Sequence, residues 1–180
     1  ESRFQPSALL RMIEMYVGEA DFRKGVQGYM RRFAYKNAEA KDLAKELERA
    51  SGKPVRKMMD GWLAQGGVPV ISVSAKRKTL TLTQSRFSAF NLKNDTQWSN
   101  PVVVRNRLKG ENKTRTASVL LDKATKSVTL PGSGELAWVY PNAGETGYYR
   151  VQLDTELLFA ALSRRGELSP AERAGLLNNL

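Results

Sequence analysis

The side chains of this chain that could do chemistry are mainly carboxylates, because its 180 residues include neither histidine nor cysteine. Zinc sites take their ligands mainly from those two residue types, and most general-base and triad chemistry uses histidine. The 18 aspartate and glutamate residues form no dense loop of the calcium-binding kind. They are scattered among basic neighbours, at spacings that suit helix caps and i,i+4 pairs. The sequence therefore predicts no catalytic residue, no cofactor-binding residue and no metal ligand in this chain.

The chain is strongly basic, with 29 lysine and arginine residues, a formal net charge of +11 and a pI near 10.0. Nucleic-acid binding has to be considered at such a charge. Residues 69–155 carry +7 of the total, largely in predicted turns such as Lys76-Arg77-Lys78, where charged side chains are simply solvated. Neither an aromatic RNA-recognition motif nor a zinc-finger pattern accompanies the charge, so we expect no nucleic-acid partner. A stand-alone β-sandwich module that binds an acidic protein or nucleic acid through residues 69–155 stays open as the alternative.

No stretch predicts a membrane span, since about 18 consecutive apolar residues would be needed and no such run occurs. The opening Glu1-Ser2-Arg3-Phe4 lacks the basic and apolar regions of a secretion signal. The sequence does not begin with methionine, and a well-formed helix start at Ser169 comes close to its last residue. We therefore expect a piece of a longer polypeptide, and the cellular compartment stays unassigned.

The first third of the chain has the apolar period of amphipathic helices. Apolar residues recur three or four positions apart, as at Leu9 and Ile13 and again at Phe22 and Val26. We predict that residues 7–66 are almost entirely helical.

After Pro69 the apolar period changes from 3.6 to 2, as in the alternation of Thr79-Leu80-Thr81-Leu82-Thr83. Clusters of Gly, Asn, Lys and Pro separate seven short β-like runs, a spacing typical of an antiparallel β-sandwich. The predicted strands are 70–73, 79–83, 101–104, 117–121, 127–130, 136–140 and 148–153.

The last residues return to a helical pattern. Ser169 is suited to cap a helix, with proline at its first position and Glu172 placed to complete a capping box. The predicted fold class is α+β with several domains: a helical segment at residues 1–68, an antiparallel β-sandwich at 69–154, and short helices at 155–180.

Two details make this architecture testable. No helix should cross Pro101–Leu130 or insert into the core of the sandwich. Trp62 and Trp138, which lie on the apolar phase of their elements, should be buried anchors of the helical part and of the sandwich respectively.

Four groups of residues resemble a known family in their order and spacing. They are Ala50-Ser51-Gly52-Lys53-Pro54-Val55 with Met59-Asp60-Gly61-Trp62 and Gln65-Gly66-Gly67-Val68-Pro69-Val70; Thr79-Leu80-Thr81-Leu82-Thr83-Gln84-Ser85-Arg86-Phe87; Trp138-Val139-Tyr140-Pro141-Asn142 with Gly147-Tyr148-Tyr149-Arg150-Val151; and Ser169-Pro170-Ala171-Glu172-Arg173-Ala174-Gly175-Leu176-Leu177-Asn178-Asn179. They resemble the M1 family of zinc aminopeptidases, in its aminopeptidase N-like form, and the resemblance extends over roughly residues 8–180.

The resemblance implies the helical end of a peptidase domain, an intact β-sandwich domain and the start of a C-terminal helical domain. It implies that the parent enzyme acts on peptide substrates and holds zinc through a His-Glu-x-x-His helix and a further glutamate. Those residues would lie before residue 8, so we expect no zinc in this chain alone. The tyrosine that stabilises the oxyanion in the family would fall near Arg3, which departs from the pattern.

The motif around Tyr148 and Tyr149 is interpreted as structural. The two rings should alternate across a strand, one facing the core and the other the neighbouring domain. Arg150 should pair with an acid there.

The helical segment should expose an apolar face, because on this resemblance it packs against the rest of a peptidase domain. We therefore expect the isolated chain to self-associate, with Leu9, Ile13, Phe22 and Val26 as the contact.

Overall fold

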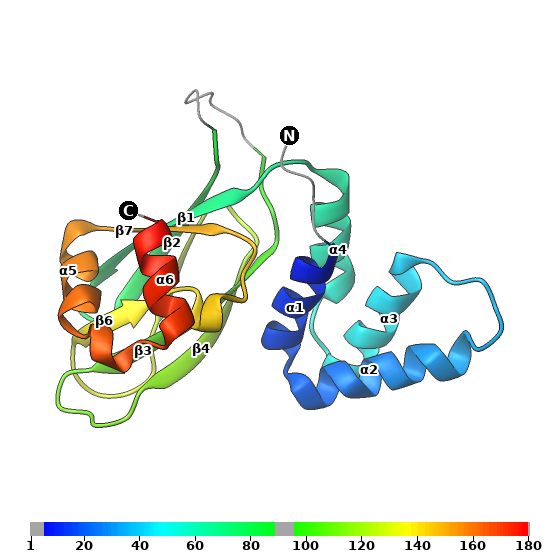
Figure 1. Ribbon diagram of the computed structural model, residues 1–180, viewed down its shortest axis with the longest axis horizontal. Coiled ribbons are helices and arrows are strands. Elements are labelled where there is room, and N and C mark those ends of the chain that lie inside the picture. Colours follow the sequence, from blue (N-terminus) through cyan, green and yellow to red (C-terminus); the bar gives the residue numbers. More distant parts are fainter. Residues whose placement is uncertain (1–5, 89–95, 180) are drawn as a thin grey trace.

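The computed structural model describes residues 6–88 and 96–179, in which four α-helices precede seven strands and two more α-helices follow (Figure 1). The helices are α1 (Pro6–Val17), α2 (Glu19–Arg32), α3 (Ala40–Ser51), α4 (Val55–Ala64), α5 (Thr155–Ser163) and α6 (Pro170–Asn178). The strands are β1 (Pro69–Lys76), β2 (Thr79–Arg86), β3 (Asn100–Leu108), β4 (Arg115–Leu121), β5 (Thr125–Thr129), β6 (Leu136–Tyr140) and β7 (Arg150–Leu153). Short 3₁₀ turns lie at Ala143–Glu145 and Arg165–Glu167. The predicted order of helices, strands and helices is confirmed.

Local residues fix the helix ends. The backbone N–H of Glu39 donates to the Asp42 carboxylate at 3.0 Å, at the start of α3. The same helix ends at Gly52, whose φ of 66° is left-handed and suits glycine. Ser169 and Glu172 form the predicted capping box of α6.

Helices α2 and α3 approach each other closely at a glycine. A Cβ atom at Gly25 would lie 2.9 Å from the Cα of Leu47, so the two backbones could not pack this way with a larger residue. Gly25 is also the one buried residue that the structure describes in α2. The apolar side chains of α2 therefore stay partly exposed.

The seven strands form two sheets, in the orders β5-β2-β1-β7 and β4-β3-β6. Neighbouring strands run antiparallel, except that β7 is parallel to β1, with Val151 opposite Ile71. The predicted strands are confirmed, and the parallel pair is an addition to the expected antiparallel pattern. It arises because the chain passes through the second sheet before it returns to its first strand, and such crossovers produce parallel neighbours.

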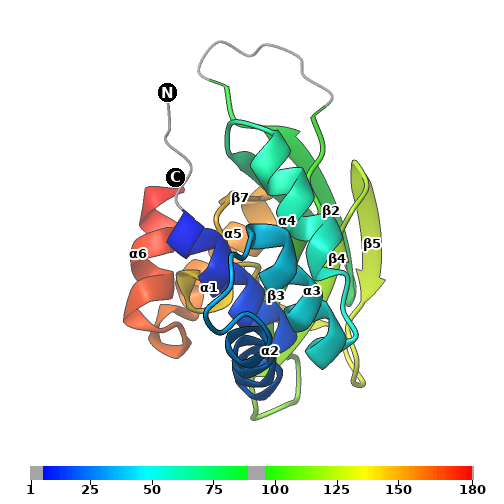
Figure 2. The same cartoon turned by 90° about the vertical axis from the view of Figure 1, so that its right-hand side faces the viewer.

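The apolar core of the sandwich continues into the helices. Leu9, Met12 and Ile13 of α1 and Trp62 of α4 belong to the same buried cluster as the inward-facing strand residues. Those strand residues are Ile71, Val73, Leu80, Leu82, Val102, Val104, Val119, Leu121, Val139 and Val151. The helical segment α1–α4 therefore adjoins the sandwich across a continuous apolar contact, and it lies in front of the sheets in the view of Figure 2.

Burial changes the expected surface of the helical segment. Leu9 is 2% exposed and Ile13 is 0% exposed, so the prediction that they make an intermolecular contact is wrong. The reason is that α1 packs against β3 and α4 within the same chain. Phe22 and Val26 are only partly buried.

Trp62 and Trp138 are buried as predicted, at 1% and 0% exposure. Trp138, however, lies in a separate cluster with Ala161 and Leu168, between the second sheet and the C-terminal helices. Successive strand residues face opposite sides, and in β6 it is Val139 that faces the interior of the sandwich.

Helices α5 and α6 lie beside the sheet β4-β3-β6 in Figure 1. Within the described residues no helix crosses Pro101–Leu130, as predicted. The helices described here are too short or too polar to cross a membrane.

Candidate functional site

The described parts of the chain hold no group of three or more His, Cys, Asp or Glu side chains placed to ligate a metal ion. The sequence contains no histidine or cysteine at all, so the residues present do not fit the zinc ion that the resemblance implies. Arg3, which stands near the expected tyrosine, lies outside the described residues. That this chain carries no catalytic or metal-binding residue stays a prediction.

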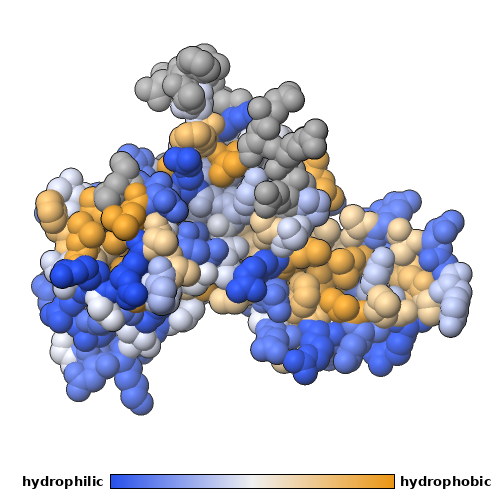
Figure 3. Space-filling model, in the orientation of Figure 1, coloured by the Kyte–Doolittle hydropathy of each residue, from blue (hydrophilic) through white to orange (hydrophobic). Residues whose placement is uncertain are grey.

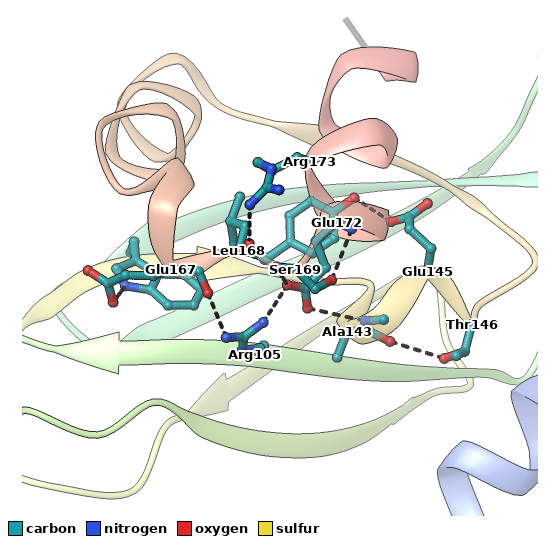
Figure 4. A network of polar contacts seen from close by, with 12 residues as sticks. Arg105, Ala143, Glu145, Thr146, Glu167, Leu168, Ser169, Glu172 and Arg173 are labelled. Carbon is teal, nitrogen blue, oxygen red and sulfur yellow. Dashed lines mark hydrogen bonds and ion pairs between the residues drawn. The ribbon is translucent and has the colours of Figure 1, made fainter.

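A partly buried network of polar contacts joins the sheet β4-β3-β6 to the C-terminal helices (Figure 4). We call it the junction network, and it consists of Arg105, Tyr140, Glu145, Glu167, Ser169 and Glu172. Its members come from β3, β6, the two 3₁₀ turns and the start of α6. The network therefore fixes several elements relative to one another.

Glu172 is at the centre of this network, and it is 1% exposed. One carboxylate oxygen accepts hydrogen bonds from the Arg105 guanidinium and, at 2.7 Å, from the backbone N–H of Ser169. The other oxygen accepts from the backbone N–H of Gly144 at 3.1 Å. A buried carboxylate is tolerated only when it is paired and hydrogen-bonded in this way.

Arg105 ties β3 to the segment that leads into α6. Besides its ion pair with Glu172, it donates to the carbonyl oxygen of Glu167 at 2.6 Å. Its guanidinium lies 5.7 Å from the centre of the Trp138 ring, whose Nε1 donates to the Glu167 carboxylate at 2.9 Å. Arg107 binds the same carboxylate at 3.0 Å. Two strand arginines thus hold one segment.

Tyr140 and Glu145 form the pH-sensitive part of the network. Burial raises the pKa of Tyr140, and the hydrogen bond to Glu145 raises it further, so the hydroxyl stays protonated and donates to the Glu145 carboxylate. Burial also raises the pKa of Glu145, the hydrogen bond from Tyr140 opposes this, and the charge of Glu172 adds to it.

The Glu145 carboxylate rests directly on helix α6. A Cβ atom at Gly175 would lie 2.3 Å from one of its oxygens, so a larger residue there would displace the acid or the helix. A change in the charge of Glu145 therefore directly affects how α6 packs against it.

A second, apolar junction joins the sandwich to the first helices. The Trp62 ring lies 5.8 Å from the ring of Trp98 and 5.7 Å from that of Tyr148, measured between centroids. Tyr149 turns the other way, is 7% exposed and donates from its hydroxyl to the Pro141 carbonyl at 2.8 Å. The prediction that the two rings alternate across a strand is wrong, because both residues precede β7. Tyr149 is nevertheless part of the buried core cluster, and Tyr148 contacts Trp62 of the helical part.

Among the residues that the structure describes, Arg150 makes no ion pair with an acid, unlike the predicted contact. Its guanidinium lies 4.3 Å from the centre of the Phe87 ring, a cation–π contact. The reason is the parallel register, which sets Arg150 opposite Val70 and so beside the end of β2.

Few local features of the sequence indicate the junction network. Arg105 follows Val102-Val103-Val104 in a strand otherwise dominated by apolar residues, and an arginine in such a place does signal a buried partner. Glu172 was recognised only as a helix cap. Tyr140 and Glu145 carry no local signal, because their surroundings depend on where α6 packs.

The arrangement positions elements and contains no pair of side chains set up as nucleophile and base. It can hold the C-terminal helices against the sandwich, and its strength depends on geometry and charge.

Comparison with known proteins connects this fold to one family. A family model described as "Peptidase family M1 domain" matches residues 4–62. Puromycin-sensitive aminopeptidase of Caenorhabditis elegans is 36% identical over 180 residues, which cover 94% of this chain and 19% of that protein. Tricorn protease-interacting factor F2 of Thermoplasma volcanium is 32% identical over 174 residues, 97% of this chain and 20% of that protein. For Aminopeptidase M1-A of Oryza sativa subsp. japonica the identity is 32% over 180 residues, 96% of this chain and 20% of that protein. The chain thus spans about a fifth of the length of these relatives.

Proposed function

We propose that this chain is a non-catalytic section of a zinc-dependent aminopeptidase. The premise is that the chain belongs to peptidase family M1. The parent enzyme would remove N-terminal amino acids from peptides. One observation carries the proposal. The matches to two proteins named as aminopeptidases run through 94% and 96% of this chain but through only 19% and 20% of those proteins. The zinc ligands and the catalytic groups would then be supplied by residues outside this sequence.

The proposal assigns a role to each part of the chain. Residues 1–68 would belong to the peptidase domain, which the family model supports by matching residues 4–62. Residues 69–154 would form a β-sandwich domain, and residues 155–180 would begin a helical domain. The sandwich would act as a spacer, with an apolar junction to the first part and a charged junction to the last.

An apolar face on the helical segment supports this role. Met30 is 63% exposed and Met15 is 40% exposed, and Phe22 and Val26 are only partly buried beside them in sequence. Figure 3 shows apolar residues gathered over the helical part of the molecule. We infer that the rest of the peptidase domain covers this face in the parent enzyme.

The isolated chain should self-associate through the same face. The contact would involve Phe22 and Val26, while Leu9 and Ile13 stay inside the monomer. Light scattering across a range of protein concentrations measures this directly. A monomer at high concentration that binds no apolar dye would contradict it.

The first functional experiment uses the chain alone. It should bind no stoichiometric zinc in equilibrium dialysis and should not hydrolyse aminoacyl chromogenic amides, with or without added zinc. Losing activated water and oxyanion stabilisation together removes two contributions that are each worth about 10² or more in rate. Chelator-sensitive turnover by the chain alone would overturn the proposal.

The second experiment places the chain in a relative. The matching segment of the C. elegans aminopeptidase is replaced by this chain and, in a parallel variant, deleted. The replacement should retain chelator-sensitive turnover, whereas the deletion should have none. A replacement protein that folds, by circular dichroism, but is as inactive as the deletion would contradict the assignment.

A further inference from the structure

One end of the sandwich is formed by three loops that lie together. They are the β1–β2 turn at residues 76–78, the β3–β4 loop at 109–114 and the β5–β6 loop at 131–135. The backbone N–H of Leu136 donates to the carbonyl of Arg77 at 3.0 Å, and that of Lys109 donates to the carbonyl of Glu135 at 2.8 Å. Hydrophilic residues cover the lower left of the molecule in Figure 3, where the β3–β4 loop of Figure 1 lies.

The positive charge of this end is not neutralised locally. Its two acids already have partners, because Glu135 binds Lys109 at 3.0 Å and Glu111 binds Arg115 at 2.8 Å. Within the described residues, Lys76, Arg77 and Lys78 make no ion pair. Lys78 donates to the carbonyl of Gly132, and the hydrogen bond from Lys109 together with the charge of Arg77 lowers the pKa of Glu135. The turn therefore presents cations that form no ion pair in the described part of the chain.

The same turn borders a depression of ≈ 570 Å³. Its lining includes the three cations and three threonines, Thr79, Thr81 and Thr129, and no acidic or aromatic residue. Ammonium, guanidinium and hydroxyl groups are hydrogen-bond donors suited to carboxylates. Without aromatic side chains the depression has no platform on which nucleic-acid bases could stack. The chemistry thus favours an acidic polypeptide.

An open strand edge adjoins the depression. β5 is the last strand on its side of the sheet β5-β2-β1-β7. Leu130 donates to the Lys78 carbonyl and Ala124 accepts from Gln84, each at 2.9 Å, so the even-numbered residues of β5 turn their backbone groups towards β2. By the alternation of an antiparallel ladder, Thr125, Ser127 and Thr129 turn theirs outwards. Such an edge can accept an extended polypeptide as an added strand.

Arg77 also occupies an unfavourable backbone conformation. It is the first residue of a two-residue hairpin turn and has a φ of 58°. Glycine is favoured at such a position, and a long side chain is unusual there. A residue that breaks the local rule at an exposed turn is typical of a functional position.

We propose that this end of the sandwich is a docking surface for an acidic, extended polypeptide segment, whose carboxylates bind at Lys76 and Arg77 and whose backbone pairs with β5. The surface borders the C-terminal junction, because Arg77 lines a depression together with Glu156 and Leu157 of α5. The residues proposed to bind the segment belong to β1, the β1–β2 turn and β5, so the proposal does not depend on the proposed aminopeptidase role.

The test measures the binding of a fluorescent hexaglutamate peptide to the 180-residue chain by anisotropy. Lys76→Ala combined with Arg77→Asn removes two cations, and asparagine tolerates the positive φ. Losing two exposed ion pairs should weaken binding by about twofold to thirtyfold. Hexaglutamine should not bind, and binding should weaken as salt is raised.

The matched control is Lys24→Ala combined with Lys36→Ala, which removes the same charge from the helical segment. It should leave the affinity unchanged. Equal loss in both double variants would show that net charge alone attracts the peptide and would overturn the proposal.

Two further arms decide between occupants and modes. Ser127→Pro removes an outward-facing N–H of β5 and should weaken hexaglutamate binding in a variant whose thermal unfolding stays cooperative. A single-stranded DNA oligonucleotide that binds more tightly than hexaglutamate, and is weakened by the Lys76 and Arg77 changes, would assign the surface to nucleic acid and overturn the proposal.

Discussion

The contacts that join the sandwich to helices α1–α4 and to the C-terminal helices are of different kinds. Towards α1–α4 the contact consists of packed rings, with Trp62 between Trp98 and Tyr148. Towards α6 it consists of ion pairs and hydrogen bonds centred on Glu172 and Arg105. Apolar burial is non-directional and almost independent of pH, whereas a buried ion pair is favourable only when its geometry is complete. The apolar junction should therefore contribute most to the free energy of unfolding, and the charged junction should fix the position of α6 on the sandwich.

The largest effect is expected at the apolar junction. Trp62→Ala should lower the free energy of unfolding by about 3–5 kcal/mol, since it leaves a cavity among buried rings. Urea denaturation measures the change. Leu63→Ala is the control, because Leu63 is 54% exposed and such a change is usually within about 0.5 kcal/mol. Equal losses in the two variants would contradict a contact centred on Trp62.

The charged junction should respond differently to single and paired changes. Arg105→Ala leaves Glu172 buried without its cation and should cost about 3 kcal/mol, the lower part of the range for broken buried pairs. Replacing both residues by methionine should recover most of that loss, because no buried charge is left unpaired. Denaturation of the three proteins tests this. If the paired variant is as unstable as Arg105→Ala, packing rather than charge holds the junction.

Asn106 offers a contrast inside the sandwich, between the two junctions. It is 0% exposed, and neither its side-chain oxygen nor its nitrogen has a partner among the described residues. Asn106→Leu should raise the free energy of unfolding by about 1–2 kcal/mol, because an unsatisfied buried polar group is replaced by an apolar one. Asn100→Leu is the comparison, since the Asn100 amide does donate to Gln84 at 3.1 Å, and it should be destabilising. A loss of stability in both would refute this reading of Asn106.

The smallest effect concerns pH at the charged junction. The pKa of Glu145 is raised above its ordinary value of 4.5, mainly by burial. The folded state therefore holds this proton more tightly than the unfolded state, and its contribution to stability is present at low pH and lost as pH rises through the raised value. Glu145→Gln should be more stable than the parent above that window, with little difference below pH 4.5. Thermal unfolding of both proteins across the range shows the divergence, and parallel curves would contradict it.

Local pattern predicted most of the fold. The alternation at residues 79–83 identified β2, and the apolar phase of Trp62 identified a buried ring, because both depend on near neighbours in sequence. Contacts between distant residues were beyond such reasoning. Arg105 and Glu172 are 67 positions apart, and nothing in either segment specifies their register. Leu9 and Ile13 were assigned to the surface because their partners lie in α4 and β3, which the period of α1 alone does not reveal.

The parallel pairing of β1 with β7 has a consequence for how the protein acquires its structure. Ser72 and Gln152, 80 positions apart, face each other across this pair and hydrogen-bond at 3.0 Å. Contacts between such distant positions close late, because a long loop must lose its freedom before they form, and they slow folding. During synthesis β1 can pair with β2 at once, yet its other edge stays open until residues 150–153 have been made. A nascent chain halted before Arg150 would leave that edge of β1 free to pair with other strands. Once the four residues of β7 are made, they pair with β1 and cover this edge.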